Sequence, residues 1–109
     1  MNVSLYVWQR ATAAVMAPMV LVHIVMIVYA TRYGVTAADI LARTRGSVVW
    51  ATFYGLFVTA ASIHGAIGLR SVLSEWTGLR ERSAGAGAWM LGVALFTLGM
   101  RAMIAVTLP

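Results

Sequence analysis

The chain has 109 residues, of which 61% are hydrophobic and only 10% are charged. That balance leaves too few polar side chains to cover a water-soluble domain. The net charge of +5 comes from arginines that cluster at the ends of apolar segments. This arrangement is typical of contact with membrane lipid headgroups and argues against nucleic-acid binding. Cysteine is absent, which excludes disulfides, thiolate-bound iron–sulfur clusters and covalently attached haem.

Three segments without a formal charge predict three membrane-spanning helices. They cover residues 11–31, 46–69 and 83–100. Each approaches the roughly 20 residues needed to cross a hydrocarbon core, and their continuous apolar character favours helices over barrel strands. With their flanks, the expected helices run over about residues 10–30, 47–74 and 84–107. The predicted fold class is therefore all-α integral membrane, with residues 1–109 forming a single domain.

The first span has two local signals. Tyr6 and Trp8 precede it, and because aromatic residues suit a membrane interface, the segment before the span is expected to lie at the membrane surface. Pro18 lies inside the span and leaves one backbone carbonyl without its helical partner. A local kink is therefore predicted there.

The two connections also carry signals. Thr36 and Asp39 have the spacing of a capping box, with Asp in place of the usual Glu or Gln, and an apolar run follows them. This pattern predicts a short interfacial helix over residues 36–44. Gly78 follows the second span and is expected to terminate it.

The third span carries a stripe of small residues. Gly85, Gly92 and Gly99 recur at intervals of seven, with Ala88 between them, and predict close packing against another helix. Arg101 lies more than one turn inside the end of this helix. It either extends outward to the headgroups or pairs with a buried anion.

The arginines divide between the two sides of the membrane. One side is expected to carry Arg10, Arg70, Arg80 and Arg82, and the other Arg32, Arg43 and Arg45. The excess of positive charge on the first side favours a cytoplasmic N-terminus.

His64 is the most informative ionisable residue within the spans. Its neighbours at helical spacing are all small, namely Ala60, Ala61, Gly68 and Ser71. Small residues around a histidine leave room for a flat ligand such as a haem, whose iron takes a neutral imidazole as axial ligand. The alternative interpretation is a histidine hydrogen-bonded to a neighbouring helix.

His23 is the second intramembrane histidine. The bulky residues on its own helix face leave less space, which favours a structural role; they are Met16, Met19 and Ile27. His23 is kept as the alternative iron ligand.

Glu75 and Trp76 follow His64 by eleven and twelve residues, which places them about 16–18 Å along the helix, near the membrane surface. A carboxylate and an indole N–H at that depth suit the binding of a quinone carbonyl and the relay of its protons. The alternative for Trp76 is an anchor in the aromatic belt.

Two motifs together resemble a known family. Arg10-Ala11-Thr12-Ala13 opens the first span, and His64-x-x-x-Gly68-Leu69-Arg70-x-x-x-x-Glu75-Trp76 closes the second. With the three-span plan, these motifs resemble the hydrophobic anchor subunits of succinate dehydrogenase, and most closely the smaller, D-type anchor of the two. The resemblance covers most of the chain.

The resemblance implies specific roles. His64 is expected to be an axial ligand of haem b and Arg10 to contact a haem propionate. Gly68 and Ser71 share the helix face of His64 and are therefore expected to border the haem. Glu75 and Trp76 stand where the family has an Asp-Tyr pair beside the quinone site. Because tyrosine donates a hydrogen bond to the quinone in the family, the indole N–H of this chain is expected to replace that donor.

The resemblance also implies three partner proteins and a localisation. The partners are a flavoprotein carrying FAD, an iron–sulfur protein and a second cytochrome b-type anchor that supplies the opposite haem ligand. The implied localisation is a bacterial inner (cytoplasmic) membrane. Ubiquinone or menaquinone is the implied substrate. The chain is expected to be a non-catalytic part of a succinate:quinone oxidoreductase. Three alternatives are a fumarate reductase anchor, a small transporter or channel using His23, His64 and Arg101, and a purely structural assembly subunit.

Overall fold

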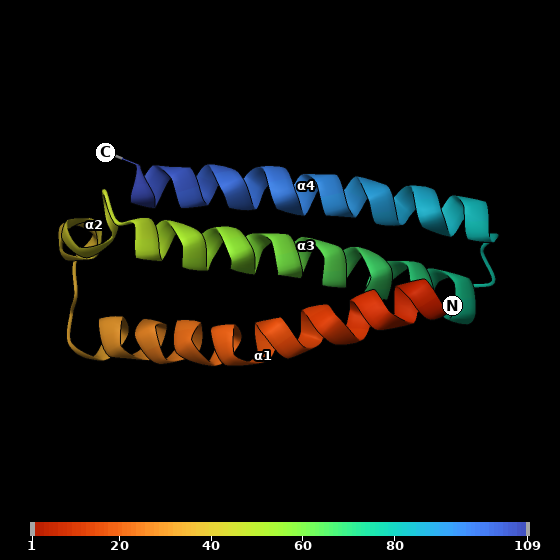
Figure 1. Cartoon of the computed structure of the whole chain (residues 1–109), viewed down its shortest axis with the longest axis horizontal. Coiled ribbons are helices and arrows are strands. Elements are labelled where there is room, and N and C mark those ends of the chain that lie inside the picture. The colour runs from red at the N-terminus through yellow and green to blue at the C-terminus, as the bar shows by residue number, and fades with distance from the viewer. Residues whose placement is uncertain (1, 109) are drawn as a thin grey trace.

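The computed structural model describes residues 2–108 and consists of three long helices lying side by side, with a short helix across one end (Figure 1). In chain order the helices are α1 (Val3–Arg32), α2 (Ala37–Thr44), α3 (Val48–Trp76) and α4 (Glu81–Thr107). The three long helices are apolar enough to cross a membrane. The longest dimension, 47 Å, matches a bilayer with its headgroup regions, about 40–45 Å. The all-α membrane fold is thus confirmed.

Helix α1 begins well before the expected position near residue 10. The side chain of Asn2 caps it, accepting a hydrogen bond of 2.8 Å from the Leu5 N–H. The segment expected at the membrane surface is therefore the first part of the spanning helix. The helix continues through Pro18, and its axis changes direction near the middle, as the proline predicts (Figure 1).

The short interfacial helix α2 has the expected capping box. The Asp39 N–H donates to the Thr36 hydroxyl, and the Thr36 N–H donates to the Asp39 carboxylate at 2.9 Å. These hydrogen bonds from the Thr36 backbone and side chain lower the pKa of Asp39 below its usual range. In Figure 1 α2 is seen end-on, so it lies across the bundle axis at one end.

Helix α2 is joined to the last turn of α4. The Thr44 hydroxyl donates to the Val106 carbonyl at 2.7 Å, and the Gly46 N–H donates to the Thr107 carbonyl at 2.7 Å. Carbonyls in the last turn of a helix have no partner within that helix. The end of α2 and the connection after it therefore satisfy two carbonyls that the third span leaves without a partner. Thr44 and Thr107 are each 2% exposed.

Helix α3 lies between the other two spans and packs most closely on α4. The stripe of small residues on α4 is the reason. A Cβ at Gly99 would lie 2.6 Å from a Val58 methyl, and one at Gly92 would lie 3.2 Å from the Ala66 methyl. Gly85, in contrast, has nothing within 4 Å of such a Cβ. The predicted close packing is thus confirmed for Gly92 and Gly99 but not for Gly85.

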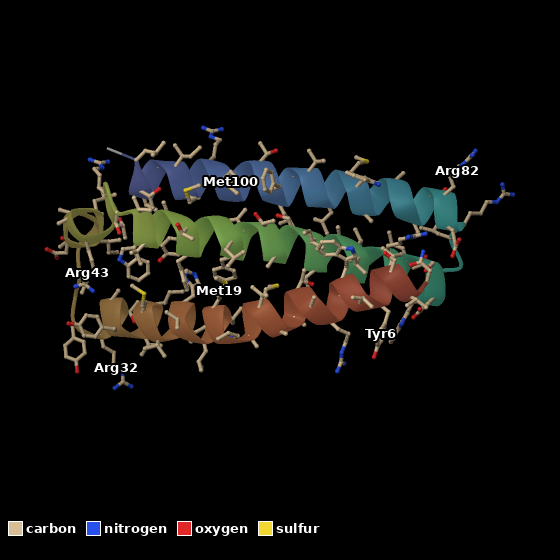
Figure 2. All side chains as sticks on the ribbon, viewed as in Figure 1. Tyr6, Met19, Arg32, Arg43, Arg82 and Met100 are labelled. Carbon is tan, nitrogen blue, oxygen red and sulfur yellow. The ribbon has the colours of Figure 1, made fainter. Side chains whose placement is uncertain are left out.

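The outer surface of the bundle is strongly apolar. Large side chains such as Leu21, Trp89 and Leu98 are 64%, 77% and 63% exposed. Charged residues gather at the two ends, with Arg32 and Arg43 at the end that carries α2 and Arg82 at the opposite end (Figure 2). This distribution is that of an integral membrane protein.

Candidate functional site

The candidate site lies where α1 and α3 meet, and its centre is His64. Nδ1 of His64 is 3.3 Å from the hydroxyl oxygen of Thr12, which is buried on α1. Within residues 2–108 the other ring nitrogen, Nε2, has no hydrogen-bond partner. His64 is only half-buried, so part of its ring reaches the surface of this chain. The fold thus brings the two sequence motifs together at one pair of side chains.

Thr12 and Gln9 are the site residues that sequence reasoning missed. Thr12 stood inside the first motif but was given no role, and the signal that identifies it is its position on the α3-facing side of α1. Gln9 lies one turn earlier, and its Nε2 is 3.5 Å from where a Cβ on Gly68 would be. A glycine at position 68 therefore lets this amide lie against α3.

The Gln9 side chain has an unusual feature. Its Oε1 is buried and, within residues 2–108, has no hydrogen-bond partner. Buried polar atoms almost always have one. The site therefore has the capacity for one more hydrogen bond than the described part of this chain supplies.

His23 lies apart from this site. Its ring makes edge contacts with Phe57, at 5.5 Å between ring centroids, and with Tyr54, at 6.2 Å. It faces a cavity of about 440 Å³ at the α2 end of the bundle, which Thr44 and Met103 also line. These aromatic neighbours come from α3 and were not visible in the helical spacing of α1.

Arg10 does not approach His64 within this chain. Its guanidinium carbon lies 5.9 Å from the centre of the Tyr6 ring. Arg10 is exposed, and it is two residues, or about 200° around the helix, from Thr12. Figure 2 shows Tyr6 pointing away from α3. The contact of Arg10 with a haem propionate stays a prediction.

Glu75 and Trp76 form the last turn of α3. Both are exposed, and Trp76 is 83% exposed. Helix α3 ends there as expected, with Gly78 at a φ of +72°. Ser71 is half-buried one turn earlier. Glu75 and Trp76 therefore lie about three turns from His64 along α3, as their spacing in the sequence predicts.

A second, larger groove runs between α3 and α4. Its volume is about 700 Å³, and it opens where Gly85, Ala88 and Gly92 carry no large side chain. Arg70 and Trp89 also line it. His64 lines neither this groove nor the cavity beside His23.

The donor chemistry at His64 fits a haem iron. A metal-binding imidazole is neutral and has its second ring nitrogen held by an outer partner, which is the arrangement of Nδ1 with Thr12. Half-burial of His64 fits a cofactor held between this chain and another. On these observations, His64 is the residue that would hold a haem.

Comparison with known proteins identifies the family of this chain. A family model described as succinate dehydrogenase/fumarate reductase transmembrane subunit matches residues 1–102. Neither a curated protein nor a solved structure matches the chain. The matched part contains α1, α2, α3 and most of α4, and it includes both motifs that meet at His64. The chain therefore belongs to the family of succinate dehydrogenase and fumarate reductase transmembrane subunits.

Proposed function

We propose that this chain is the smaller, D-type membrane anchor of a succinate dehydrogenase, that it binds haem b, and that it helps to form the quinone site. The contact between Thr12 and His64 carries this proposal, because it joins the two motifs on which the resemblance rests. A neutral imidazole held at Nδ1 inside a membrane is suited to bind iron through Nε2.

The haem, when bound, supplies a one-electron redox centre. His64 would bind the haem iron, and Gly68 and Ser71 would border the haem. Arg10 would contact a haem propionate from the exposed face of α1. This chain supplies one suitable histidine at the site, so a second anchor would supply a further ligand.

Quinone reduction takes place at the end of α3. Two electrons from succinate and two protons convert a quinone to its quinol. The Trp76 indole N–H donates a hydrogen bond to a quinone carbonyl, and the Glu75 carboxylate passes protons from the aqueous side. Both residues are exposed in this chain, which suits a site completed by neighbouring subunits.

The complete complex contains a flavoprotein with FAD, an iron–sulfur protein and a second cytochrome b-type anchor. Its place is the bacterial inner membrane, with the end that carries Arg82 and Trp76 on the cytoplasmic side. A fumarate reductase anchor, which passes electrons from quinol instead, uses the same residues and is the alternative within the family.

A transporter or channel is less well supported by the geometry. The proposed path requires His23, His64 and Arg101 to form a polar route. His64 contacts Thr12, which is eleven residues and about 16 Å along α1 from His23. The rings next to His23 are those of Tyr54 and Phe57, and Arg101 is exposed on α4. These residues do not form one continuous route.

Purification of the intact complex tests the function directly. We expect the chain to co-purify with a flavoprotein, an iron–sulfur protein and another small membrane protein, and the complex to have a b-type α-band in a reduced-minus-oxidised absorption spectrum. The physical reason is that this chain offers one histidine at the site, so a haem bound there would need a further ligand from a partner. A stable haem-free monomer would contradict the proposal, and a complex without haem would favour a structural assembly role.

The quinone site predicts a selective defect for Trp76→Leu. We expect quinone reduction to fall about 10- to 100-fold, because a quinone carbonyl left without its donor inside the assembled site costs roughly 1–3 kcal/mol. Succinate oxidation with an artificial soluble acceptor should stay nearly unchanged, because the soluble proteins of the complex perform it. Trp89→Leu is the matched control, since Trp89 is almost as exposed, at 77%, but lies on α4. Equal loss in both assays for Trp76→Leu would indicate failed assembly instead.

A further inference from the structure

The Thr12 hydroxyl lies within hydrogen-bond distance of three groups. Its oxygen is 2.8 Å from the Trp8 carbonyl, 3.1 Å from the Gln9 carbonyl and 3.3 Å from Nδ1 of His64. A hydroxyl has one proton to donate and two lone pairs with which to accept. Carbonyl oxygens only accept, whereas Nδ1 donates or accepts according to the tautomer.

The two tautomers of His64, with the proton on Nδ1 or on Nε2, differ in the number of hydrogen bonds that Thr12 can make. If the hydroxyl donates its proton to Nδ1, it has none left for the Trp8 or Gln9 carbonyl. Only one hydrogen bond then forms. If the hydroxyl donates to a backbone carbonyl one turn back, its oxygen accepts the Nδ1 proton of His64, and two hydrogen bonds form. In a buried, low-dielectric environment the arrangement with more hydrogen bonds is favoured, which is the tautomer with its proton on Nδ1. Thr12 is 6% exposed, so water does not supply the missing bond.

We propose that Thr12 is a positioning residue that fixes the tautomer of His64: its hydroxyl accepts the Nδ1 proton and leaves Nε2 unprotonated as the nitrogen that binds the haem iron. This inference rests on the proposed haem function. It adds a residue from α1 whose effect on the cofactor acts entirely through an α3 side chain.

Thr12 also affects the electron density of the imidazole. A hydrogen bond accepted from Nδ1–H makes Nε2 more basic, and a more basic ligand favours ferric over ferrous iron. Thr12 therefore holds the haem midpoint potential down. The backbone geometry supports this role, since the hydroxyl is anchored to its own helix by a carbonyl one turn back and is not free to rotate toward another partner.

The test compares Thr12→Val, which keeps the shape of the side chain and removes the hydroxyl, with Thr12→Ser, which keeps the hydroxyl. In the purified complex we expect Thr12→Val to shift the haem midpoint potential upward and to weaken haem retention about 10- to 100-fold, the usual effect of losing an outer partner of a metal ligand. Thr12→Ser should restore both. Thr59→Val is the matched control, because among residues 2–108 the Thr59 hydroxyl bonds only to the Gly55 carbonyl of its own helix.

The outcomes separate this inference from the proposed function. If the unmodified complex contains haem, His64→Ala loses it, and Thr12→Val retains the native potential and haem content, the positioning role is wrong while the haem function stands. If Thr12→Ser shifts the potential as far as Thr12→Val, side-chain shape and not the hydroxyl matters, which also overturns the inference. If the unmodified complex has no haem, the proposed function itself fails.

Discussion

His64→Ala is expected to remove the b-type spectrum from the purified complex, whereas His23→Ala should leave it close to normal. The reason is the difference between their surroundings. His64 has its Nδ1 held by Thr12 and its Nε2 without a protein partner in the described chain. His23 instead packs against the rings of Tyr54 and Phe57. The measurement is the ratio of haem to flavin in each purified variant.

The ratio of haem to flavin does not depend on how much complex is purified. A variant complex that assembles poorly loses flavin and haem together, so its ratio stays constant. His64→Ala should lower the ratio to near zero. Loss of haem in His23→Ala but not in His64→Ala would reverse the ligand assignment, and loss of about half in each would indicate two haems. If neither variant changes the ratio, the anchor binds haem through other residues or not at all.

Gly99→Ala is expected to destabilise the packing of α3 on α4 by about 1–3 kcal/mol, the usual cost of an added methyl group in a filled contact. The new Cβ would lie 2.6 Å and 2.9 Å from the two Val58 methyls and 3.3 Å from the Val58 Cβ. A rotation of the valine side chain does not relieve this contact, because both methyls and the branching carbon are close. The helices must therefore move apart.

Gly85→Ala is the matched control for this experiment. It makes the same chemical change on the same helix, but nothing lies within 4 Å of the new Cβ. The thermal midpoint of the purified complex should fall for Gly99→Ala and stay within error for Gly85→Ala. The double change Gly99→Ala with Val58→Ala should recover part of the loss, because the smaller residue removes the contact. Equal midpoints for Gly99→Ala and Gly85→Ala would show that α3 and α4 are not in close contact at Gly99.

Much of the fold could be predicted from the sequence because its signals are local. The three spans follow from runs of uncharged residues, the capping box from two residues three apart, and the end of α3 from Gly78. The start of α1 was misplaced for a physical reason. Arg10 marks a change in polarity, and polarity reports depth in the membrane, whereas the helix begins where Asn2 caps its free N–H groups.

The candidate site could be predicted only in part. His64 was identified because its small neighbours lie on its own helix. Thr12 and Gln9 lie more than fifty residues earlier in the chain, and helical spacing carries no information on which face of α1 meets α3. Likewise, the seven-residue spacing of the glycines on α4 is the same at Gly85 and Gly99. Only the neighbouring helix distinguishes a crowded glycine from an open one.

The bonds between α2 and α4 have a consequence for biogenesis. The carbonyls that the Thr44 hydroxyl and the Gly46 N–H need belong to residues about sixty positions later, in the last turn of α4. A chain emerging from the ribosome presents α2 to the membrane surface before those carbonyls exist. The capping box of α2 needs no distant partner, since Thr36 and Asp39 lie three residues apart. The two hydrogen bonds to α4, in contrast, cannot form until the third span has been made and its last turn is in place.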